Sequence, residues 1–198
     1  MFTGIVQELG RVVAREPRGD DLRLLIACRR LEAWEVHAGD SLCVQGCCLT
    51  ATEVARDTFA VDLSRETLDV TNLGGLRADA TVNLEPALKA GDALGGHLVS
   101  GHVDGVGAVL EVSADARSRR VRIGVPAGLA RYLAPKGSVA VDGVSLTINS
   151  AGAADLCVNV IPHTLEHTTL GTLAGGERVN LEVDTVARYL ARLLEMRT

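Results

Sequence analysis

DSLCVQGCCLT, residues 40–50, is followed 97 positions later by a near copy, GSVAVDGVSLT, at residues 137–147. Both copies hold Ser, Val, Gly, Leu and Thr at the same places, whereas Cys48 becomes Ser145 and Gln45 becomes Asp142. Each stretch alternates apolar and polar side chains, as half-buried strands do, around a glycine that indicates a bulge or a close backbone approach. The chain therefore repeats one β-rich scaffold and changes its polar groups.

The same offset of 97 aligns further blocks without a gap. These blocks are residues 67–74 with 164–171, residues 82–85 with 179–182, and Gly4, Val6 and Gly10 with Gly101, Val103 and Gly107. A period this long, present in two copies, indicates a duplicated domain, because solenoid units are only about 20–50 residues long. We expect a first domain at residues 1–97 and a second at residues 98–184.

Short runs rich in Val and Leu recur within each half, separated by Gly, Asp and Asn at intervals of roughly ten residues. This pattern predicts an all-β fold, either a sandwich or a barrel. The strand candidates are residues 22–28, 41–54, 59–63 and 80–85. Short helices are expected at residues 31–34 and 129–133, and again at residues 65–68 and 163–165.

The end of the chain breaks the β pattern. Asp184 or Thr185 can cap a helix there. The apolar positions that follow recur at i, i+4, i+7 and i+8, and they are Val186, Leu190, Leu193 and Leu194. This amphipathic helix over residues 185–198 has no counterpart in the first half of the sequence, and it either covers its own domain or forms an oligomer contact.

Composition narrows the class of protein. A chain of 198 residues with 47% apolar residues can bury a substantial core. The net charge is −5 and the densest basic cluster, residues 117–122, is typical of a solvated hairpin, so nucleic acid is not an expected partner. Because no apolar stretch approaches the ~18 residues of a membrane span and residues 1–4 lack the basic start of a signal peptide, we expect no membrane contact and a cytoplasmic location.

Five cysteines form neither a disulfide framework nor a paired zinc motif, which favours reduced thiols. Residues two apart on a strand share a face, so Cys48 and Thr50 present a thiol and a hydroxyl together, and Ser145 and Thr147 present two hydroxyls. Cys47 points to the opposite side. Packing is the expected role of Cys47 and of the other three cysteines, Cys28, Cys43 and Cys157.

Histidines are unevenly divided between the halves. His102 replaces Ile5 and His163 replaces Glu66, so the second half holds more groups that can move a proton near neutral pH. A structural role is expected for two other histidines, His37 and His97. His163 and His167 lie four apart but not in the zincin order, and no metal site is expected.

Four separated motifs then carry a resemblance. They are MFTGIV at residues 1–6, GCCLT at residues 46–50, GGHLVSGHV at residues 95–103 and DGVSLT at residues 142–147. Together they resemble the riboflavin synthase family, alpha chain, and the resemblance spans the whole chain. It implies two six-stranded Greek-key β-barrels, each binding one 6,7-dimethyl-8-ribityllumazine, and terminal helices that join three chains into a homotrimer.

The family resemblance also implies a reaction. A four-carbon unit passes from one lumazine to another and gives riboflavin and 5-amino-6-ribitylaminouracil, without a metal or an organic cofactor. The active site is expected between the first barrel of one chain and the second barrel of a neighbour. A capsid of lumazine synthase is a further partner to consider.

Motif by motif, the resemblance assigns site residues. One lumazine is expected to contact Gly4, Ile5, Val6, Cys48, Leu49, Thr50, Asp62, Leu63, Ser64, Arg65, Glu66 and Thr67. The other is expected to contact Gly101, His102, Val103, Ser145, Leu146, Thr147, Asn159, Val160, Ile161, Pro162, His163 and Thr164, with Lys136 reaching across from another chain. The hypothesis for catalysis is that Cys48 and Ser41 act on one lumazine as nucleophile or proton relay, while His102, Ser145, Thr147 and Asp142 serve the other.

Two alternatives remain at this point. The lumazine proteins keep both barrels but bind a single chromophore as optical antennae, and they typically lose polar residues of the catalytic set that this chain retains. A barrel-type flavin reductase domain would require a nicotinamide domain with a parallel sheet, which these 198 residues do not supply. Gln45 stands where the family is expected to have Asn, which leaves the hydrogen bonding near the first pocket open.

Overall fold

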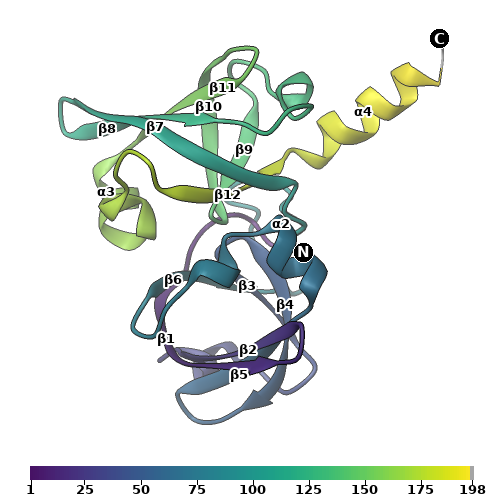
Figure 1. The fold of residues 1–198 in the computed structure, drawn as a ribbon, viewed down its shortest axis with the longest axis vertical. Helices are drawn as coiled ribbons and strands as arrows, with labels where there is room; N and C mark the ends of the chain where they lie inside the picture. Colours follow the sequence, from purple (N-terminus) through teal and green to yellow (C-terminus); the bar gives the residue numbers. More distant parts are fainter. Residues whose placement is uncertain (197–198) are drawn as a thin grey trace.

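Each half forms six strands, and each set of six closes into an antiparallel β-barrel (Figure 1). The structure, a computed structural model, describes residues 1–196. The first barrel comprises β1 (Glu8–Arg18), β2 (Asp21–Ala27), β3 (Ser41–Val44), β4 (Cys47–Val54), β5 (Thr58–Leu63) and β6 (Thr81–Pro86). The second comprises β7 (Gly105–Asp115), β8 (Ser118–Gly124), β9 (Ser138–Val141), β10 (Val144–Ala151), β11 (Asp155–Val160) and β12 (Arg178–Val183).

Strand order is the same in both barrels. The first runs β1-β2-β5-β4-β3-β6, and the second follows the equivalent order β7-β8-β11-β10-β9-β12 around its ring. The predicted all-β fold of two six-stranded barrels followed by a helix is therefore confirmed.

Short helices lie at the four predicted places, with one difference between the halves, and two further 3₁₀ turns, at residues 73–75 and 169–172, were not predicted. They are α1 (Leu31–Trp34), α2 (Arg65–Val70), η1 (Leu73–Gly75), η2 (Ala130–Tyr132), α3 (Pro162–His167) and η3 (Thr169–Thr172). The counterpart of α1 in the second half is the 3₁₀ turn η2 and not an α-helix. The last helix, α4 (Thr185–Glu195), is capped by the Asp184 side chain, which accepts a hydrogen bond from the Val186 amide at 2.9 Å.

Two strand predictions were wrong in detail. Residues 41–54 form two strands, because Gln45 (φ 49°) and Gly46 (φ 82°) reverse the chain between β3 and β4. Positive φ at both central residues is the geometry of a tight hairpin turn. Strand β1 was missed, since a register shift between Val12 and Ala14 interrupts its alternation and its last residues, 15–18, are exposed.

The core is divided into three parts. Each barrel encloses its own apolar cluster, and a smaller cluster of Phe2, Cys43, Val99 and Ala140 lies where the barrels meet. All five cysteines are free, and all except Cys48 are buried. The predicted packing role of the other four is confirmed, and burial raises the pKa of the Cys47 thiol to about 12.

At the contact between the barrels, the two copies of the repeated turn lie back to back. A Cβ atom on Gly46 would lie 2.6 Å from the amide nitrogen of Gly143, and a Cβ atom on Gly143 would lie 2.8 Å from that of Gly46. Both residues also have positive φ. Glycine is thus required at both positions for two reasons: the turn needs positive φ, and the other turn approaches too closely for a Cβ atom.

Reciprocal hydrogen bonds fix this junction. Asn83 on β6 donates from Nδ2 to the Asp142 carbonyl at 2.9 Å, and Asn180 on β12 donates from Nδ2 to the Gln45 carbonyl at 2.8 Å. Each asparagine belongs to one barrel and holds the turn of the other. The duplication therefore produces a pseudo-symmetric pair of barrels with a defined relative position.

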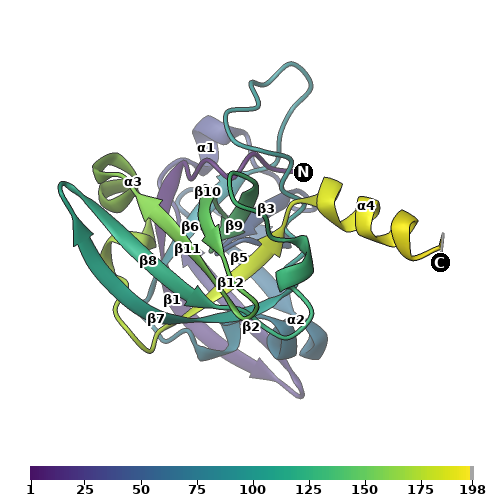
Figure 2. The same ribbon diagram turned by 90° about the horizontal axis from the view of Figure 1, so that it is seen from above.

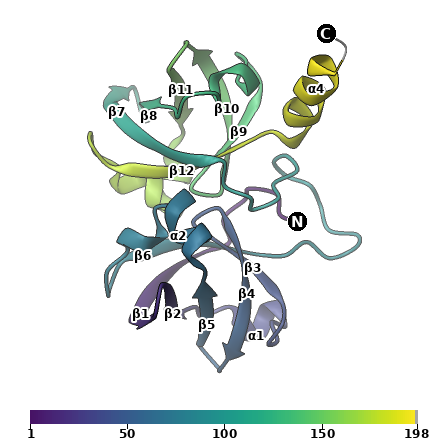
Figure 3. The ribbon, with the colours of Figure 1, turned by 45° about the vertical axis from the view of Figure 1, so that its right-hand side comes forward.

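Helix α4 leaves the second barrel and extends into solvent, as Figures 1 and 2 show from two directions. One face of it exposes apolar side chains, including Tyr189, Leu190 and Leu193, which are 57–68% exposed. Figure 3 shows the linker between the barrels as a long loop on the same side as the N-terminus. Within residues 1–196, none of the helices has the length and apolar character needed to span a membrane.

Candidate functional site

The first candidate surface is the outward face of the β3–β4 hairpin. Ser41 pairs with Thr50, and Cys43 pairs with Cys48. Their neighbours Cys47 and Leu49 belong to the barrel core, so the four paired residues point outward. Cys48 is partly exposed and Thr50 is exposed, which leaves a thiol and hydroxyls available on one face.

The second candidate surface is the equivalent face of the β9–β10 hairpin. Here Ser138 pairs with Thr147, and Ala140 pairs with Ser145. Leu146 lies in the second core, as Leu49 lies in the first. Only the backbones of these two leucines are therefore available to a ligand outside the barrel.

A crossing segment from the other half covers each of these faces. The Cys48 amide on the first barrel donates to the Gly101 carbonyl at 2.8 Å, and the Ser145 amide on the second barrel donates to the Gly4 carbonyl at 2.8 Å. A Cβ atom on either Gly101 or Gly4 would lie 2.6 Å from the Cβ of its partner. The two segments can approach the strands this closely because glycine has no Cβ atom.

The two crossing segments group the candidate site residues differently from the sequence-based expectation. The sequence grouped Gly4, Ile5 and Val6 with Cys48, but Gly4 contacts Ser145 and Val6 packs against the second core. The segment containing His102 lies instead on the first barrel, where Val103 packs against the core. The reason is that residues 1–6 and 100–104 precede their own barrels in sequence and cross to the opposite barrel in space.

Two equivalent buried carboxylates anchor the crossing segments. Glu85 on β6 accepts hydrogen bonds from the Thr3 amide (2.7 Å), the Thr3 hydroxyl (2.7 Å) and the Gly4 amide (3.0 Å). Glu182 on β12 accepts from the Ser100 amide (2.6 Å) and the Gly101 amide (2.8 Å). Burial raises the pKa of Glu85, and it raises the pKa of Glu182 to about 7.

His97 is a candidate that the sequence interpretation missed. Its Nδ1 lies 2.7 Å from the Ser145 hydroxyl, and the residue is 9% exposed. Burial lowers the pKa of His97, so the ring is neutral at neutral pH and can accept the hydroxyl proton. The signal was its place in the Gly95-Gly96-His97 motif, five residues before His102, although a structural role was expected for it.

Asp142 was expected in the catalytic set, but the structure places it in the junction between barrels. Its Oδ1 accepts from the Asn180 amide at 2.8 Å and from Nδ2 of Asn72 at 3.2 Å. Gln45 does the same in the first half, where its Oε1 accepts from the Asn83 amide at 2.7 Å. Asp142 is 2% exposed, and burial raises the pKa of its carboxyl to about 7.

Comparison with known proteins agrees with this architecture. A family model described as the lumazine binding domain matches residues 3–87 and again residues 100–184. A riboflavin synthase from Mycobacterium bovis is 48% identical over 198 residues, covering 98% of each chain. One from Photobacterium phosphoreum is 40% identical over 194 residues, covering 98% of this chain and 89% of the other. The chain belongs to the riboflavin synthase family of duplicated lumazine-binding barrels.

Solved structures extend this family likeness. LumP complexed with 6,7-dimethyl-8-(1'-D-ribityl)lumazine has a TM-score of 0.83 and is 27% identical, covering 92% of this chain and 99% of its own. LumP complexed with riboflavin has a TM-score of 0.86 at the same identity and coverage. The double barrel of the riboflavin synthase family is thus shared with a protein whose structures hold a lumazine and a flavin.

The remaining residues that the riboflavin synthase resemblance assigned lie around both faces. Asp62 and Asn159 occupy exposed or partly exposed positions on β5 and β11, next to β4 and β10, while Leu63 and Val160 are buried. Ser64 caps α2 by accepting from the Thr67 amide at 3.3 Å. The other members, which are Arg65, Glu66, Thr67, Ile161, Pro162, His163 and Thr164, form the starts of α2 and α3. Lys136 is exposed just before β9.

Two orphaned polar atoms mark the second face. Among residues 1–196, the buried side-chain atoms without a hydrogen-bond partner are Asn72 Oδ1, His97 Nε2 and Asn159 Oδ1. Buried polar groups are nearly always paired in native proteins, so such atoms are where a ligand or water is expected to bind. His97 contacts Ser145, and Asn159 lies on the adjacent strand β11, so both belong to the second candidate surface of this riboflavin synthase relative.

Two hollows of a single chain lie away from these faces. One of about 850 Å³ is lined by residues around α1, such as Leu31 and Arg56, and one of about 970 Å³ lies at the junction and includes Asp142. Neither is lined by Cys48 or Ser145. In this member of the riboflavin synthase family the faces at Cys48 and Ser145 lie outside these hollows, and volume alone does not locate the chemistry.

Proposed function

We propose that this protein is a riboflavin synthase, which transfers a four-carbon unit between two molecules of 6,7-dimethyl-8-ribityllumazine. The observation that carries the proposal is the pair of equivalent faces at Cys48 and Ser145, each covered by a crossing segment from the other half. Two similar surfaces with different polar groups suit two copies of one substrate that meet different fates. The riboflavin synthases among its relatives, at 37–48% identity, support the same reaction.

Two lumazine molecules contain all the atoms of the two products, riboflavin and 5-amino-6-ribitylaminouracil. One lumazine gives up four carbons and becomes the pyrimidine, and the other receives them and becomes the flavin. The position 7 methyl group of the substrate is acidic, because its anion delocalises into the ring. The enzyme can therefore work by orienting two rings and relaying protons, without a strong base.

On the first face we assign Cys48 and Ser41 to one lumazine, as nucleophile or proton relay. His102, which the sequence assigned to the other lumazine, is placed with them in this proposal, since Gly101 contacts Cys48 and His102 is exposed beside it. An imidazole on this face provides a group that can accept and return a proton near neutral pH.

On the second face we assign Ser145 and Thr147 to the other lumazine. His97 supports this role, because its Nδ1 shares a hydrogen bond of 2.7 Å with the Ser145 hydroxyl. Asp142 is proposed to position the β9–β10 turn that carries this face. The orphaned Asn159 Oδ1 is a candidate acceptor for a polar group of the substrate.

We also propose that three chains assemble through α4 and that each active site combines the first barrel of one chain with the second barrel of a neighbour. The apolar face of α4 and the partly exposed Cys48 and Ser145 support this arrangement. Lys136, exposed before β9, is proposed to reach the site of another chain. The five free cysteines support a cytoplasmic location, and cosedimentation would test association with a lumazine synthase capsid.

The direct test is to incubate the purified protein with 6,7-dimethyl-8-ribityllumazine alone and separate the products. Riboflavin and the pyrimidine should form in equal amounts, with two lumazines consumed per riboflavin. Binding of lumazine with unchanged absorbance over hours would contradict the proposal. It would favour the antenna alternative, which the likeness to LumP supports. Cys48→Ala and His102→Gln should each slow turnover about tenfold or more in folded protein, as expected for proton-transfer groups.

A further inference from the structure

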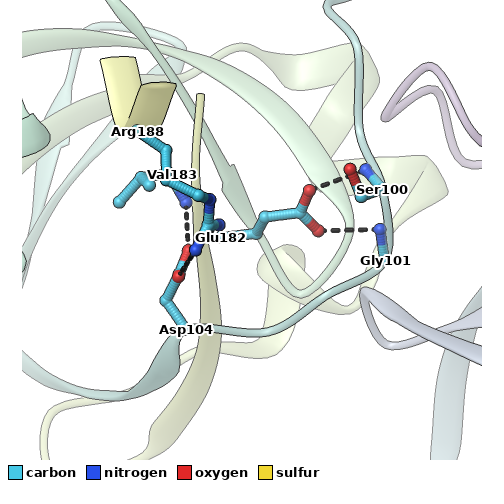
Figure 4. A network of polar contacts seen from close by, with 6 residues as sticks. All are labelled: Ser100, Gly101, Asp104, Glu182, Val183 and Arg188. Atoms are coloured by element: carbon cyan, nitrogen blue, oxygen red, sulfur yellow. Dashed lines mark hydrogen bonds and ion pairs between the residues drawn. The ribbon is translucent and has the colours of Figure 1, made fainter. Parts of the chain in front are cut away.

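Helix α4 is tied to the second barrel by an ion pair that reaches a crossing segment (Figure 4). Arg188 on α4 contacts Asp104 through two hydrogen bonds, Nη1 to Oδ1 at 2.5 Å and Nη2 to Oδ2 at 2.9 Å. The Asp104 side chain is 9% exposed and that of Arg188 is 39% exposed. A two-point contact between a planar guanidinium and a carboxylate fixes orientation as well as distance.

Asp104 ends the segment that crosses to the first barrel. Its Oδ2 also accepts a hydrogen bond from the Val183 amide at 2.8 Å, just before α4 begins. At the other end of the segment, Glu182 holds the Ser100 and Gly101 amides, as Figure 4 shows. His102 therefore lies on a short strap, residues 100–104, that is fastened to β12 on both sides.

The strap continues to the candidate nucleophile. The Gly101 carbonyl accepts the Cys48 amide at 2.8 Å, so the contacts run from Arg188 through Asp104 and Gly101 to Cys48. Helix α4 is thereby connected to the first candidate face, although α4 follows the second barrel in sequence.

The duplication supplies an internal comparison. Glu85 and Glu182 are equivalent and hold equivalent amides in both halves. The residue aligned with Asp104 is Gln7, which is neutral and donates to the nearby Ile5 carbonyl at 3.4 Å, and the residue aligned with Arg188 is Gly91. The ion pair has thus been added only to the strap that carries a histidine.

We propose that Arg188 and Asp104 are positioning residues that couple the seating of α4 to the placement of His102 beside Cys48. This inference rests on the proposed function for its catalytic consequence. Packing of the apolar face of α4 in an assembly fixes the helix, and the two-point contact then fixes Asp104 and the strap. A chain whose α4 is unseated holds His102 less well, so turnover depends on the helix without any helix residue touching substrate.

A second ion pair on α4 provides a matched control. Arg131 in η2 contacts Glu195 near the end of α4 at 2.6 Å, and it also fastens the helix to the second barrel. The contacts described for Arg131, which are with Glu195 and the Tyr132 ring, do not include the strap. Removing either pair loosens the helix, but only removal of the Arg188 pair takes a partner from Asp104, which keeps its hydrogen bond from the Val183 amide.

The experiment compares Arg188→Gln, Arg188→Lys, Asp104→Asn and Arg131→Gln in the full chain. Lumazine turnover should show a kcat at least fivefold lower for Arg188→Gln and Asp104→Asn, with KM changed less than twofold. Arg188→Lys should recover part of the loss, because lysine keeps the charge but not the two-point contact. Arg131→Gln should stay within twofold of the unmodified protein, and all four should keep its oligomeric mass.

A second readout does not require turnover. The imidazole resonances of His102, identified by their loss in His102→Gln, should shift in Arg188→Gln and Asp104→Asn but not in Arg131→Gln. Equal effects of Arg131→Gln and Arg188→Gln, unchanged His102 resonances in Arg188→Gln, or loss of its oligomeric mass would each overturn the inference. Absence of turnover in the unmodified protein would refute the proposed function alone, and the His102 resonances would still decide the coupling.

Discussion

At the scale of single residues, the two candidate faces carry different polar groups at equivalent positions of a shared frame. Cys48 and Ser145 occupy equivalent positions, and each donates its amide to an equivalent glycine carbonyl. A thiol and a hydroxyl differ in acidity and nucleophilicity, so under the proposed function this exchange gives the two faces different tasks.

Exchanging these two residues tests that separation. A Cys48→Ser and Ser145→Cys double variant keeps composition and volume, but it moves the thiol beside His97 and the hydroxyl beside His102. We expect turnover to fall about tenfold or more, measured as the rate of riboflavin formation by the folded protein. Full activity of the exchanged protein would show that the asymmetry has no catalytic role.

Asp142 is predicted to make stability depend on pH. Burial raises its pKa to about 7, whereas the carboxyl titrates near ~3.9 in the unfolded chain, so the folded state binds the proton more tightly. The favourable contribution of the protonated form is complete below pH ~4 and is lost as pH rises towards ~7, a change of up to about 4 kcal/mol. Asp142→Asn should abolish this contribution to the pH dependence.

The measurement is the free energy of unfolding by denaturant at several pH values. Asp142→Asn should equal the parent protein near pH ~4 and exceed it by about 2–4 kcal/mol at pH ~8. The amide oxygen can still accept from the Asn180 amide, as that of Gln45 accepts from Asn83 in the first half. Parallel pH profiles for the two proteins would show that Asp142 is not the group responsible.

Sequence reasoning went furthest for residues whose side-chain direction follows from strand periodicity. Cys48, Thr50, Ser145 and Thr147 were placed on outward faces because alternation along a strand requires it. Asp142 sits at a turn position with φ 47°, where alternation no longer applies, and its contacts come from the other barrel and from β12. His97 was missed because a lone histidine in a linker gives no local sign of its distant partner.

At the scale of elements, the crossing segments show how a repeated motif acquires a partner from the other half. Alignment of the repeats pairs residues 4–6 with 101–103, but it does not show on which barrel each segment lies. That is decided by Glu85 and Glu182, by the packing of Val6 and Val103, and by the glycines at Gly4 and Gly101.

Gly101→Ala should be far more harmful than a glycine substitution at an open turn. Gly19 has φ 65°, and a Cβ atom added there would meet nothing within 4 Å, so Gly19→Ala should cost only the left-handed conformation, about 1 kcal/mol. Gly101 has φ 77°, and its Cβ would lie 2.6 Å from Cys48 Cβ, so Gly101→Ala adds a steric clash and should cost about 3 kcal/mol. Equal losses of unfolding free energy in Gly101→Ala and Gly19→Ala would mean that the strap, residues 100–104, moves to make room for the added Cβ atom.

The success of the strand and helix predictions depended on how regular each element is. Runs rich in apolar residues, such as β2 and β5, were found, and the capped amphipathic helix α4 was found to Glu195, while residues 197–198 of the predicted helix lie outside the described residues. Strand β1 escaped because its register shift mixes the two faces. The turn at Gln45 and Gly46 escaped because positive φ at a non-glycine residue leaves little trace in sequence.

At the scale of the whole molecule, α4 is the element that breaks the pseudo-symmetry. Leu190→Asp should convert the proposed trimer to a single chain, since a carboxylate on a 57% exposed apolar position would have to be buried in the proposed interface. Leu94→Asp, at a 50% exposed position in the linker, is the matched control. Light scattering would measure both masses, and an unchanged mass for Leu190→Asp would place the assembly surface elsewhere.

The arrangement of the molecule as a whole accounts for why one chain carries two barrels. Reciprocal bonds from Asn83 and Asn180 fix the barrels relative to each other, and each barrel supplies a segment that completes the face of the other. The chain thus carries two linked surfaces for one kind of ligand, and neither surface is complete in an isolated half.

The most direct test of two substrate-binding faces is the number of lumazine molecules that one chain binds. A ribityllumazine that lacks the acidic position 7 methyl group cannot react, so calorimetric titration with it reports occupancy alone. We predict two molecules bound per chain, with unequal affinities because the faces carry different polar groups. A single molecule per chain would contradict this, because one of the two faces would then have no substrate to hold.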